Sequence, residues 1–310
     1  MIKTILLTVL LFLSLIFHKE VIAGASYGLL LWYQALIPAL FPFIIITNTI
    51  SSSHSYETLT FYLKKKIPDI YIFISFLLGN LCGYPIGAKI LNDFVNYGYI
   101  GNKEANRLLA VVSQASPMFL IGFVYQLIPD GMLALPAFLF LMYTPSILFF
   151  VLILISGKTK NDNLMINTRS IPNKDTTVII HNNDNGSLID SAKIMVTIGI
   201  YVIIFSIVSK TGLHLIERCS IKDPFFLTAA KCSLSMLEIT NGLKLIENLS
   251  ISDKYITALI MFLSSFGGLC TAFQIKGVLN YEKNTIKKYL CDKLIIATGT
   301  LFLTLIYIKN

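Results

Sequence analysis

The amino-acid sequence predicts an all-α polytopic membrane protein, and three observations support this fold class. Hydrophobic residues make up 55% of the 310 residues and charged residues only 14%, whereas roughly a quarter of an average globular domain is charged. Several apolar runs reach the length of about 20 residues with which a helix crosses a bilayer core of about 30 Å. The lysines and arginines behind the net charge of +8 lie mostly in the gaps between these runs, which is typical of loops beside a membrane and argues against a nucleic-acid partner.

About nine membrane segments follow from these runs. The first, Ile5 to Phe17, fits either a signal peptide or a first membrane helix, and we favour an uncleaved helix. The others are expected near Gly24 to Ile50, Ile70 to Asn92, Arg107 to Ile128, Met132 to Ser156, Ser191 to His214, Pro224 to Glu247, Lys254 to Leu279 and Lys288 to Ile308. Together they predict one membrane domain over residues 1–310, with the lipid bilayer as its surroundings.

A polar stretch divides this domain into halves, residues 24–156 and 191–310. Residues Gly157 to Asp190 are rich in Asn, Asp, Lys, Thr and Ser, which predicts a solvated linker. With nine full crossings, ten lysines and arginines fall on each side of the membrane, so the positive-inside rule gives no orientation. This tie indicates that at least one segment is re-entrant or miscounted.

Short motifs recur in the same order in the two halves. Ile46-Thr47-Asn48 returns as Ile239-Thr240-Asn241, and Gly79-Asn80-Leu81-Cys82 is echoed by Gly267-Gly268-Leu269-Cys270. The shared order predicts a two-fold internal repeat. If all five segments between the repeat starts cross the membrane, the repeat is inverted, as in secondary transporters; if one is re-entrant, it is parallel.

Three places interrupt strongly apolar sequence with glycine, proline and polar residues, and they supply most candidate substrate-binding residues. Proline lacks a backbone donor and glycine permits unusual dihedrals, so the freed backbone groups must be met by protein, ion or solute. The alternative is close helix packing and kinking. The candidates are Asn80, Gly83, Tyr84, Pro85, Gly87 and Lys89 in the first place, Ser113, Ser116 and Pro117 in the second, and Gly267, Gly268, Gln274 and Lys276 in the third.

Charged residues inside apolar runs add to this set. Glu238, just before Thr240 and Asn241, is the carboxylate set most deeply in an apolar run, and a membrane-embedded acid is a functional candidate unless it only pairs with a lysine such as Lys231. Lys89 and Lys276 each follow an interrupted stretch. They are candidates for contacting an anion, with snorkelling to the headgroups as the alternative.

The sequence offers no pattern for catalysis or for a cofactor. The four histidines show no metal-ligand spacing, and the five cysteines contain no CxxC pair. Walker, Rossmann and nucleophile-elbow motifs are absent. We therefore expect no enzymatic activity, cofactor or metal.

The first half contains Gly83-Tyr84-Pro85-Ile86-Gly87-Ala88-Lys89, followed by residues 104–108 and residues 115–119, and the second half contains residues 238–242 and 266–274. Together these motifs resemble the YlbJ (SpoVV) family of sporulation integral membrane proteins, which contains the membrane nucleoside recognition or gate domain. In the second half, Glu238-Ile239-Thr240-Asn241-Gly242 is similar to the family's Glu-Ile-Thr-x-Gly. The stretch from Phe266 to Gln274 is also similar. Gln114 and Ala115 depart from the polar pair that the family usually has before Ser-Pro, which leaves the substrate open.

The resemblance implies a fold related to concentrative nucleoside transporters and, for sporulation members, passage of dipicolinic acid across the outer forespore membrane. The leading hypothesis is therefore a multi-pass cell-membrane transporter or facilitator of a small anionic solute, with dipicolinate favoured. Two alternatives stay open, a non-transporting assembly or signalling component of sporulation and a nucleoside-type transporter. An ATP-driven pump is not indicated, because no ATP-binding motif is present.

Overall fold

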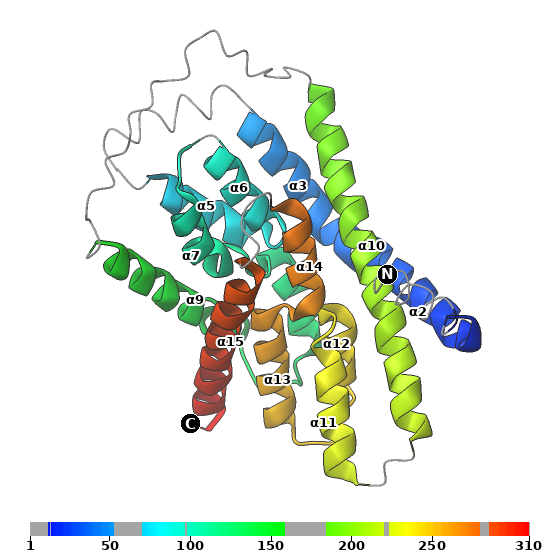
Figure 1. The fold of residues 1–310 in the computed structure, drawn as a ribbon. Coiled ribbons are helices and arrows are strands. Elements are labelled where there is room, and N and C mark those ends of the chain that lie inside the picture. The colour runs from blue at the N-terminus through cyan, green and yellow to red at the C-terminus, as the bar shows by residue number, and fades with distance from the viewer. Residues whose placement is uncertain are drawn as a thin grey trace.

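Every element in the described part of the chain is a helix. The computed structural model describes residue 12 and residues 14–52, 70–96, 98–158, 184–219, 223–279 and 285–309. Most of the predicted first segment, Ile5 to Phe17, and of the predicted linker, Gly157 to Asp190, therefore lies outside the described residues. The helices form a bundle, and the long helix α10 (Asp184–Arg218) runs along one side of it from the upper to the lower end (Figure 1).

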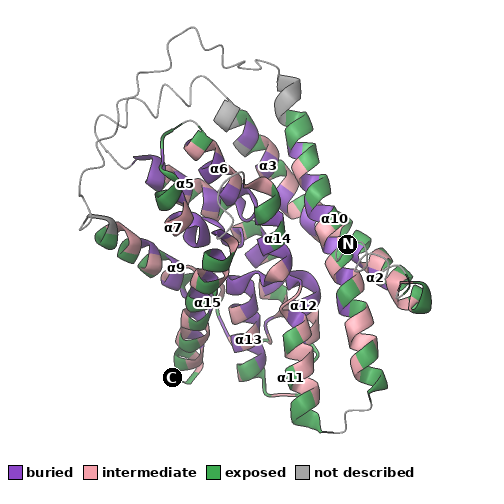
Figure 2. Ribbon diagram, in the orientation of Figure 1, coloured by how far each residue is buried: buried purple, intermediate pink, exposed green. Residues whose placement is uncertain are grey.

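Six described helices are long and apolar enough to cross a membrane, namely His18–Ile46, Asn102–Leu127, Leu135–Ser156, Leu188–Arg218, Asp253–Val278 and Thr285–Lys309. Large apolar side chains such as Phe140, Leu152 and Phe302 are exposed on their outer faces. Figure 2 shows exposed residues along the outer sides of α9 (Leu135–Lys158), α10 (Asp184–Arg218) and α15 (Thr285–Lys309). Soluble proteins rarely expose apolar surface on this scale, and the chain is a multi-pass membrane protein.

The first half begins with a long helix that contains a π-helical turn. α2 (His18–Leu31), the π turn η1 (Trp32–Leu36) and α3 (Ile37–Ser52) follow one another directly. The Trp32 indole donates a hydrogen bond to the Met195 carbonyl of α10, with 3.0 Å between Nε1 and O. Its ring packs against the backbone of Gly199, where a Cβ would lie 2.6 Å from a ring carbon. The only tryptophan of the chain thus fixes this helix to α10.

The next two helices form a hairpin. α5 (Ile70–Cys82) and α6 (Ile86–Asn96) have 13 and 11 residues, which extend only about 16–20 Å. At the open end, the Tyr71 ring meets Phe94 edge-on. Near the closed end, a Cβ at Gly87 would lie 3.1 Å from the Gly79 Cα. The chain therefore enters from one side, turns inside the bundle and returns to the same side.

A broken span and an unbroken one complete this half. α7 (Asn102–Val112) ends before residues 113–116, which are not helical. The path continues through α8 (Pro117–Phe119), the π turn η2 (Leu120–Val124) and the 3₁₀ turn η3 (Tyr125–Leu127), and α9 then runs back across the bundle.

The second half has the same order of elements. The long helix α10 is followed by α11 (Pro224–Ser235) and α12 (Ile239–Glu247), which lie so close that a Cβ at Gly242 would overlap the Ser235 carbonyl oxygen. α13 (Asp253–Phe266) breaks at Gly267 and continues as α14 (Gly268–Val278), and α15 is the last helix. In Figure 1 the α11–α12 hairpin lies at the opposite end of the molecule from the α5–α6 hairpin.

The predicted number of nine crossing segments is not confirmed. The predicted segments Ile70 to Asn92 and Pro224 to Glu247 are hairpins of two half-length helices. Hydropathy alone does not separate such a hairpin from one span, because both have the same apolar length. The predicted interruptions within apolar segments are present. Re-entrant crossing, which would account for the tie in the lysine and arginine count, stays a prediction.

The register that we predicted for the internal repeat does not match the element order. Ile46-Thr47-Asn48 lies in the long helix α3, whereas Ile239-Thr240-Asn241 begins the short helix α12. Gly79 to Cys82 ends α5, whereas Gly267 to Cys270 spans the break between α13 and α14. Short matches arise easily in a sequence so rich in Ile, Leu and Gly, and they do not fix a register.

Glycines allow the closest helix contacts. Cβ atoms at Gly24 and Gly28 would lie 2.7 Å and 2.9 Å from α-carbons of α10, so α2 packs against α10 through a small-xxx-small face. Cβ atoms at Gly79 and Gly87 would both overlap the Val112 carbonyl oxygen. The hairpin α5–α6 thus holds the end of α7, just where α7 breaks.

We predict that Gly79→Ala and Gly87→Ala each destabilise the fold, because the new methyl group displaces the Val112 backbone. Overpacking of this kind costs about 1–3 kcal/mol. Thermal unfolding of the purified variants in detergent measures the effect as a lower midpoint temperature. The matched control is Gly122→Ala, since a Cβ there has no atom within 4 Å. Equal midpoints for all three variants would contradict the predicted contacts.

Candidate functional site

The helix interruptions meet pairwise in the interior through backbone hydrogen bonds. In the first half, the Tyr84 amide in the α5–α6 turn donates to the Gln114 carbonyl in the α7–α8 break, at 3.0 Å. In the second half, the Leu269 and Cys270 amides donate to the Met236 and Leu237 carbonyls in the α11–α12 turn, both at 2.8 Å. In each half, therefore, the turn of the re-entrant hairpin is bonded to the break in the following span.

The first turn explains why its motif contains glycine and proline. Gly83 has a φ of +81°, and a Cβ there would lie 3.0 Å from the Ser116 amide nitrogen. The Tyr84–Pro85 peptide bond is cis. The Tyr84 side chain is buried, and its hydroxyl has no hydrogen-bond partner among the described residues. Asn80, one turn earlier, donates to the Phe76 and Val111 carbonyls at 2.7 and 3.0 Å, which ties α5 to α7.

The break between α7 and α8 is polar and fully buried. Ser116 caps the short helix α8 by accepting a hydrogen bond from the Phe119 amide at 3.3 Å, and Pro117 occupies its first turn. Gln114 donates to the Ala110 carbonyl and the Ser146 hydroxyl, both at 3.1 Å. Within the part of the chain that the structure describes, the buried Ser113 hydroxyl has no partner.

Glu238 forms the turn of the second hairpin and faces the protein interior, as predicted. It is 2% exposed. Its carboxylate accepts hydrogen bonds from the Thr240 and Asn241 amides at 3.0 and 2.8 Å and from the Asn241 side chain at 2.8 Å. The Thr240 hydroxyl donates to it at 2.6 Å. Glu238 is thus the N-cap of α12, where a negative charge is favoured by the helix dipole.

The alternative, that Glu238 only forms an ion pair with Lys231, is not supported by the structure. Among the described residues, no ion pair joins Glu238 to a lysine. The hydrogen-bond chain continues instead from Asn241 to the Ser206 hydroxyl of α10 at 2.6 Å. The carboxylate thereby fixes α12 both to its own turn and to the long helix beside it.

The third interruption approaches the first, as predicted. Gly267 and Gly268 have φ values of +86° and +80°, which favour glycine. A Cβ at Gly267 would lie 3.5 Å from the Tyr84 ring, and one at Gly268 would lie 3.5 Å from the Glu238 Cα. The two predicted regions therefore meet as interrupted helices inside the bundle, and Glu238 lies beside them.

Sequence reasoning missed the second charged group in this region, Lys293 on α15. This lysine has no exposed surface. Its ammonium donates to the Gln114 side-chain oxygen at 2.8 Å and to the Ser265 carbonyl at 3.0 Å. A signal was present, because Tyr289, Lys293 and Thr300 are polar residues at helical spacing within a predicted span.

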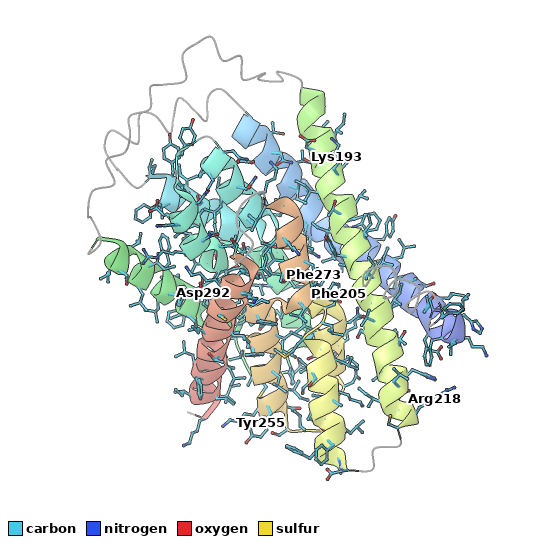
Figure 3. All side chains as sticks on the ribbon, in the orientation of Figure 1. Lys193, Phe205, Arg218, Tyr255, Phe273 and Asp292 are labelled. Atoms are coloured by element: carbon cyan, nitrogen blue, oxygen red, sulfur yellow. The ribbon has the colours of Figure 1, made fainter. Side chains whose placement is uncertain are left out.

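The larger described cavity, of about 260 Å³, lies between α6, α10 and α14. Three predicted residues line it, Pro85, Lys89 and Gln274. Sequence reasoning missed its α10 wall, which consists of Asp190, Lys193, Ile194, Thr197 and Ile198. In Figure 3, Lys193 projects from the upper part of α10. We call this cavity the α6–α10–α14 pocket.

Aromatic side chains link two of the helices that line this pocket. The Phe273 ring of α14 packs on Phe205 of α10, with centroids 5.6 Å apart, and on Tyr201 at 6.5 Å. Figure 3 shows Phe205 and Phe273 side by side below the level of Lys193. These ring contacts hold α10 and α14 together.

The two predicted lysines differ in position. Lys89 is part-buried and donates to the Asn48 side chain at 3.2 Å and to Asp93 at 3.1 Å. Lys276 is exposed and does not line the pocket. The predicted pairing of Lys89 with Lys276 as equivalent anion ligands is therefore not supported, because α14 turns Lys276 outward while Gln274 faces the pocket.

A smaller cavity of about 20 Å³ lies at the interruptions themselves, lined by Gly83, Tyr84, Ala115, Ser116 and Ile239 together with Leu36, Leu40 and Phe119. The described residues contain no cluster of three or more His, Cys, Asp or Glu that resembles a metal site. The chemistry available in the interior is therefore hydrogen bonding, two buried charges and the ends of broken helices.

Comparison with other proteins agrees with the motifs. No family model matches the chain, and no solved structure matches it. Sporulation integral membrane protein YlbJ of Bacillus subtilis (strain 168) is 21% identical over 317 aligned positions, which cover 91% of this chain and 76% of that protein. Over nearly its whole length the chain is thus similar to a sporulation integral membrane protein, which supports the YlbJ-type resemblance read from its interrupted helices.

Proposed function

We propose that this chain is a transporter or facilitator of a small anionic solute, and that dipicolinate is its solute in a spore-forming cell. The observation that carries the proposal is the meeting of two broken spans and two re-entrant hairpins in the interior, with Glu238 and Lys293 buried beside them. In membranes, non-helical backbone at depth occurs where it is buried in protein or lines a cavity, and such places form the binding sites of transporters.

The element order supports alternating access. Each half consists of a long helix, a hairpin, a broken span and a final long helix, and the hairpins enter from opposite ends (Figure 1). In transporters with inverted repeats, the two halves can exchange conformations, and this exchange opens a central site first to one side of the membrane and then to the other. We propose an inverted repeat in this register, which pairs the first hairpin with the second and the α7 break with Gly267.

The α6–α10–α14 pocket has the donors that a dicarboxylate requires. Lys89 and Lys193 supply ammonium groups, which a solute would share with Asp93 and Asp190, their ion-pair partners at 3.1 Å. Gln274 and Thr197 supply neutral side chains. An anion entering a bundle needs such groups to replace its water. The volume of about 260 Å³ is slightly below that of pockets for drug-sized ligands, about 300–1,000 Å³, which suits a small solute. By this proposal the pocket receives the solute, and the interruptions pass it on.

The YlbJ similarity adds the biological setting. That relative is named as a sporulation integral membrane protein, and we propose a place in the outer forespore membrane for this chain. We propose no catalytic role, since the interior groups are used in capping and helix-end contacts.

The first test is uptake of dipicolinate by purified protein in liposomes, with uridine as the comparison solute. We expect saturable dipicolinate uptake above that of empty liposomes and little uptake of uridine. Uridine uptake alone would favour the nucleoside-type alternative. Uptake of neither solute by folded protein would favour a non-transporting sporulation component and would end the transport proposal.

The second test compares a lysine that lines the pocket, Lys89, with one that does not, Lys276. Lys89→Gln removes an ammonium group from the pocket and should raise the KM for dipicolinate about tenfold, because a hydrogen bond to a charged group contributes about 1.5–3 kcal/mol. Lys276→Gln is the matched control and should leave KM within about twofold, since Lys276 lies outside the pocket. Equal changes in KM for the two variants would rule out the pocket as the solute site.

The third test concerns the turn of the second hairpin. Glu238→Leu leaves the Thr240 and Asn241 amides without their acceptor, and each unsatisfied buried group costs about 1–3 kcal/mol. We expect this variant to lose uptake. Glu238→Gln keeps an amide oxygen as acceptor and should retain a measurable part of the uptake. Uptake per folded protein is the measurement, and normal uptake by Glu238→Leu would show that the turn has no role in transport.

A further inference from the structure

Lys293 is a charged side chain that is fully buried in the bundle and has no charged partner among the described residues. It lies about 12 Å along α15 from Thr285, well inside the span. Its ammonium has two neutral acceptors, Gln114 and Ser265. Among the described residues, no carboxylate lies within ion-pair distance of it.

The other buried charge does not compensate it. The Glu238 carboxylate is occupied by the Thr240 and Asn241 donors at the start of α12. An ammonium without a counter-ion is costly in hydrocarbon surroundings. Either loss of its proton or arrival of an anion would remove this cost.

The position of Lys293 links it to both halves. Gln114 belongs to the α7–α8 break, and Ser265 lies two residues before the α13–α14 break. Two buried hydroxyl groups next to these partners, those of Ser113 and Ser264, have no hydrogen-bond partner among the described residues. The ammonium thus lies where the two broken spans come together, and unused donors flank its two acceptors.

Few other titratable groups occur on the inward parts of the helices that pack against α15. α7 has none between Arg107 and its end, and α13 has none between Tyr255 and Gly267. α9 contributes Tyr143, whose hydroxyl donates to the Ala115 carbonyl, and α14 contributes Cys270. On α15 itself, the neighbouring groups are Lys288, Tyr289, Cys291 and Asp292. Lys293 is the one cation in the middle of this part of the described bundle.

We propose that Lys293 is the proton-binding group that couples anion movement to protons, an inference that rests on the proposed anion transport. The neutral amine takes a proton from hydronium on the uptake side, which leaves water and an ammonium. This ammonium then neutralises the solute carboxylate inside the bundle. When the solute leaves, the ammonium returns its proton to water on the other side. Proton and anion thus bind cooperatively, and each raises the affinity for the other by the same factor.

A lysine suits this role better than an arginine. Lysine can exchange its proton when buried, whereas arginine stays charged. The competing explanation is that Lys293 only stabilises the carbonyl end of α13, where a positive charge is favoured by the helix dipole. This structural role also predicts a buried cation, but it predicts no proton uptake when an anion binds.

Titration calorimetry with dipicolinate as the probe separates the two roles. Measurements on the purified protein, in buffers of different ionisation enthalpy, give the number of protons taken up per anion bound. The fluorescence of Trp32 reports binding independently, because it contacts α10 at Met195 and Gly199, beside pocket residues of the same helix. Dipicolinate stays fully ionised between about pH 6 and about pH 9, so the solute does not contribute to the pH dependence.

We expect the unchanged protein to take up close to one proton for each dipicolinate bound. At the alkaline end of the pH range, the Kd for dipicolinate should rise nearly tenfold for each unit increase in pH. Lys293→Met should bind weakly with no pH dependence. Lys293→Arg should bind with no pH dependence and should lose uptake driven by a proton gradient. Lys276→Met is the control and should behave as the unchanged protein.

Two outcomes would overturn the proposed role of Lys293, and they differ in what they imply for anion transport. Dipicolinate binding without proton uptake, or with the same pH dependence in Lys293→Met, would overturn the coupling role and leave anion transport standing. No binding and no liposomal uptake by folded, unchanged protein at any pH would overturn the proposed function and this inference with it. The proton count needs no variant, so the test holds even if Lys293→Met fails to fold.

Discussion

The structure depends on one constraint, that each backbone amide and carbonyl in the membrane interior needs a partner within the protein. The chain breaks two spans and turns two hairpins inside the bundle, and each of these places frees backbone groups. The backbone groups freed at a hairpin turn form hydrogen bonds with those freed at the neighbouring break. The Tyr84 amide donates to the Gln114 carbonyl, and the Leu269 amide donates to the Met236 carbonyl. Each hairpin therefore stays in place because the neighbouring span is broken at the matching depth.

The same constraint determines which residues the motifs contain. Gly83 supplies a positive φ, and Gly87 lets α6 approach the Val112 carbonyl. At the second hairpin, Glu238 meets the free amides of α12, and Gly242 lets α12 approach Ser235. Residues that first suggest solute contact are thus used to stabilise turns. The cavity of about 260 Å³ lies elsewhere, between α6, α10 and α14, and Lys293 lies at the two breaks.

The two buried charges differ in their surroundings, and this difference gives them different roles. Glu238 has several donors from its own helix, so its charge belongs to the architecture. Among the described residues, Lys293 has only neutral acceptors, one from each broken span, and the proposed proton coupling rests on this difference. Under that proposal, a change in the charge of Lys293 would act on both breaks together, because one acceptor belongs to each.

Local sequence patterns were enough to predict the helical membrane class, three of the four described interruptions and the inward position of Glu238, because hydropathy, proline, glycine and charge act locally along the chain. The turn between α11 and α12 was not predicted, since Met236, Leu237 and Glu238 include neither glycine nor proline. Tertiary structure decided which segments cross and which return, since a hairpin and a span have the same apolar length. It also showed that the motif pairs from which we predicted a repeat lie on different kinds of element. Tertiary structure likewise decided that Lys276 faces outward and that Lys293 lies at the breaks. The environment of a lysine is set by helices distant in sequence, here Gln114 on one and Ser265 on another, and no local pattern contains that information.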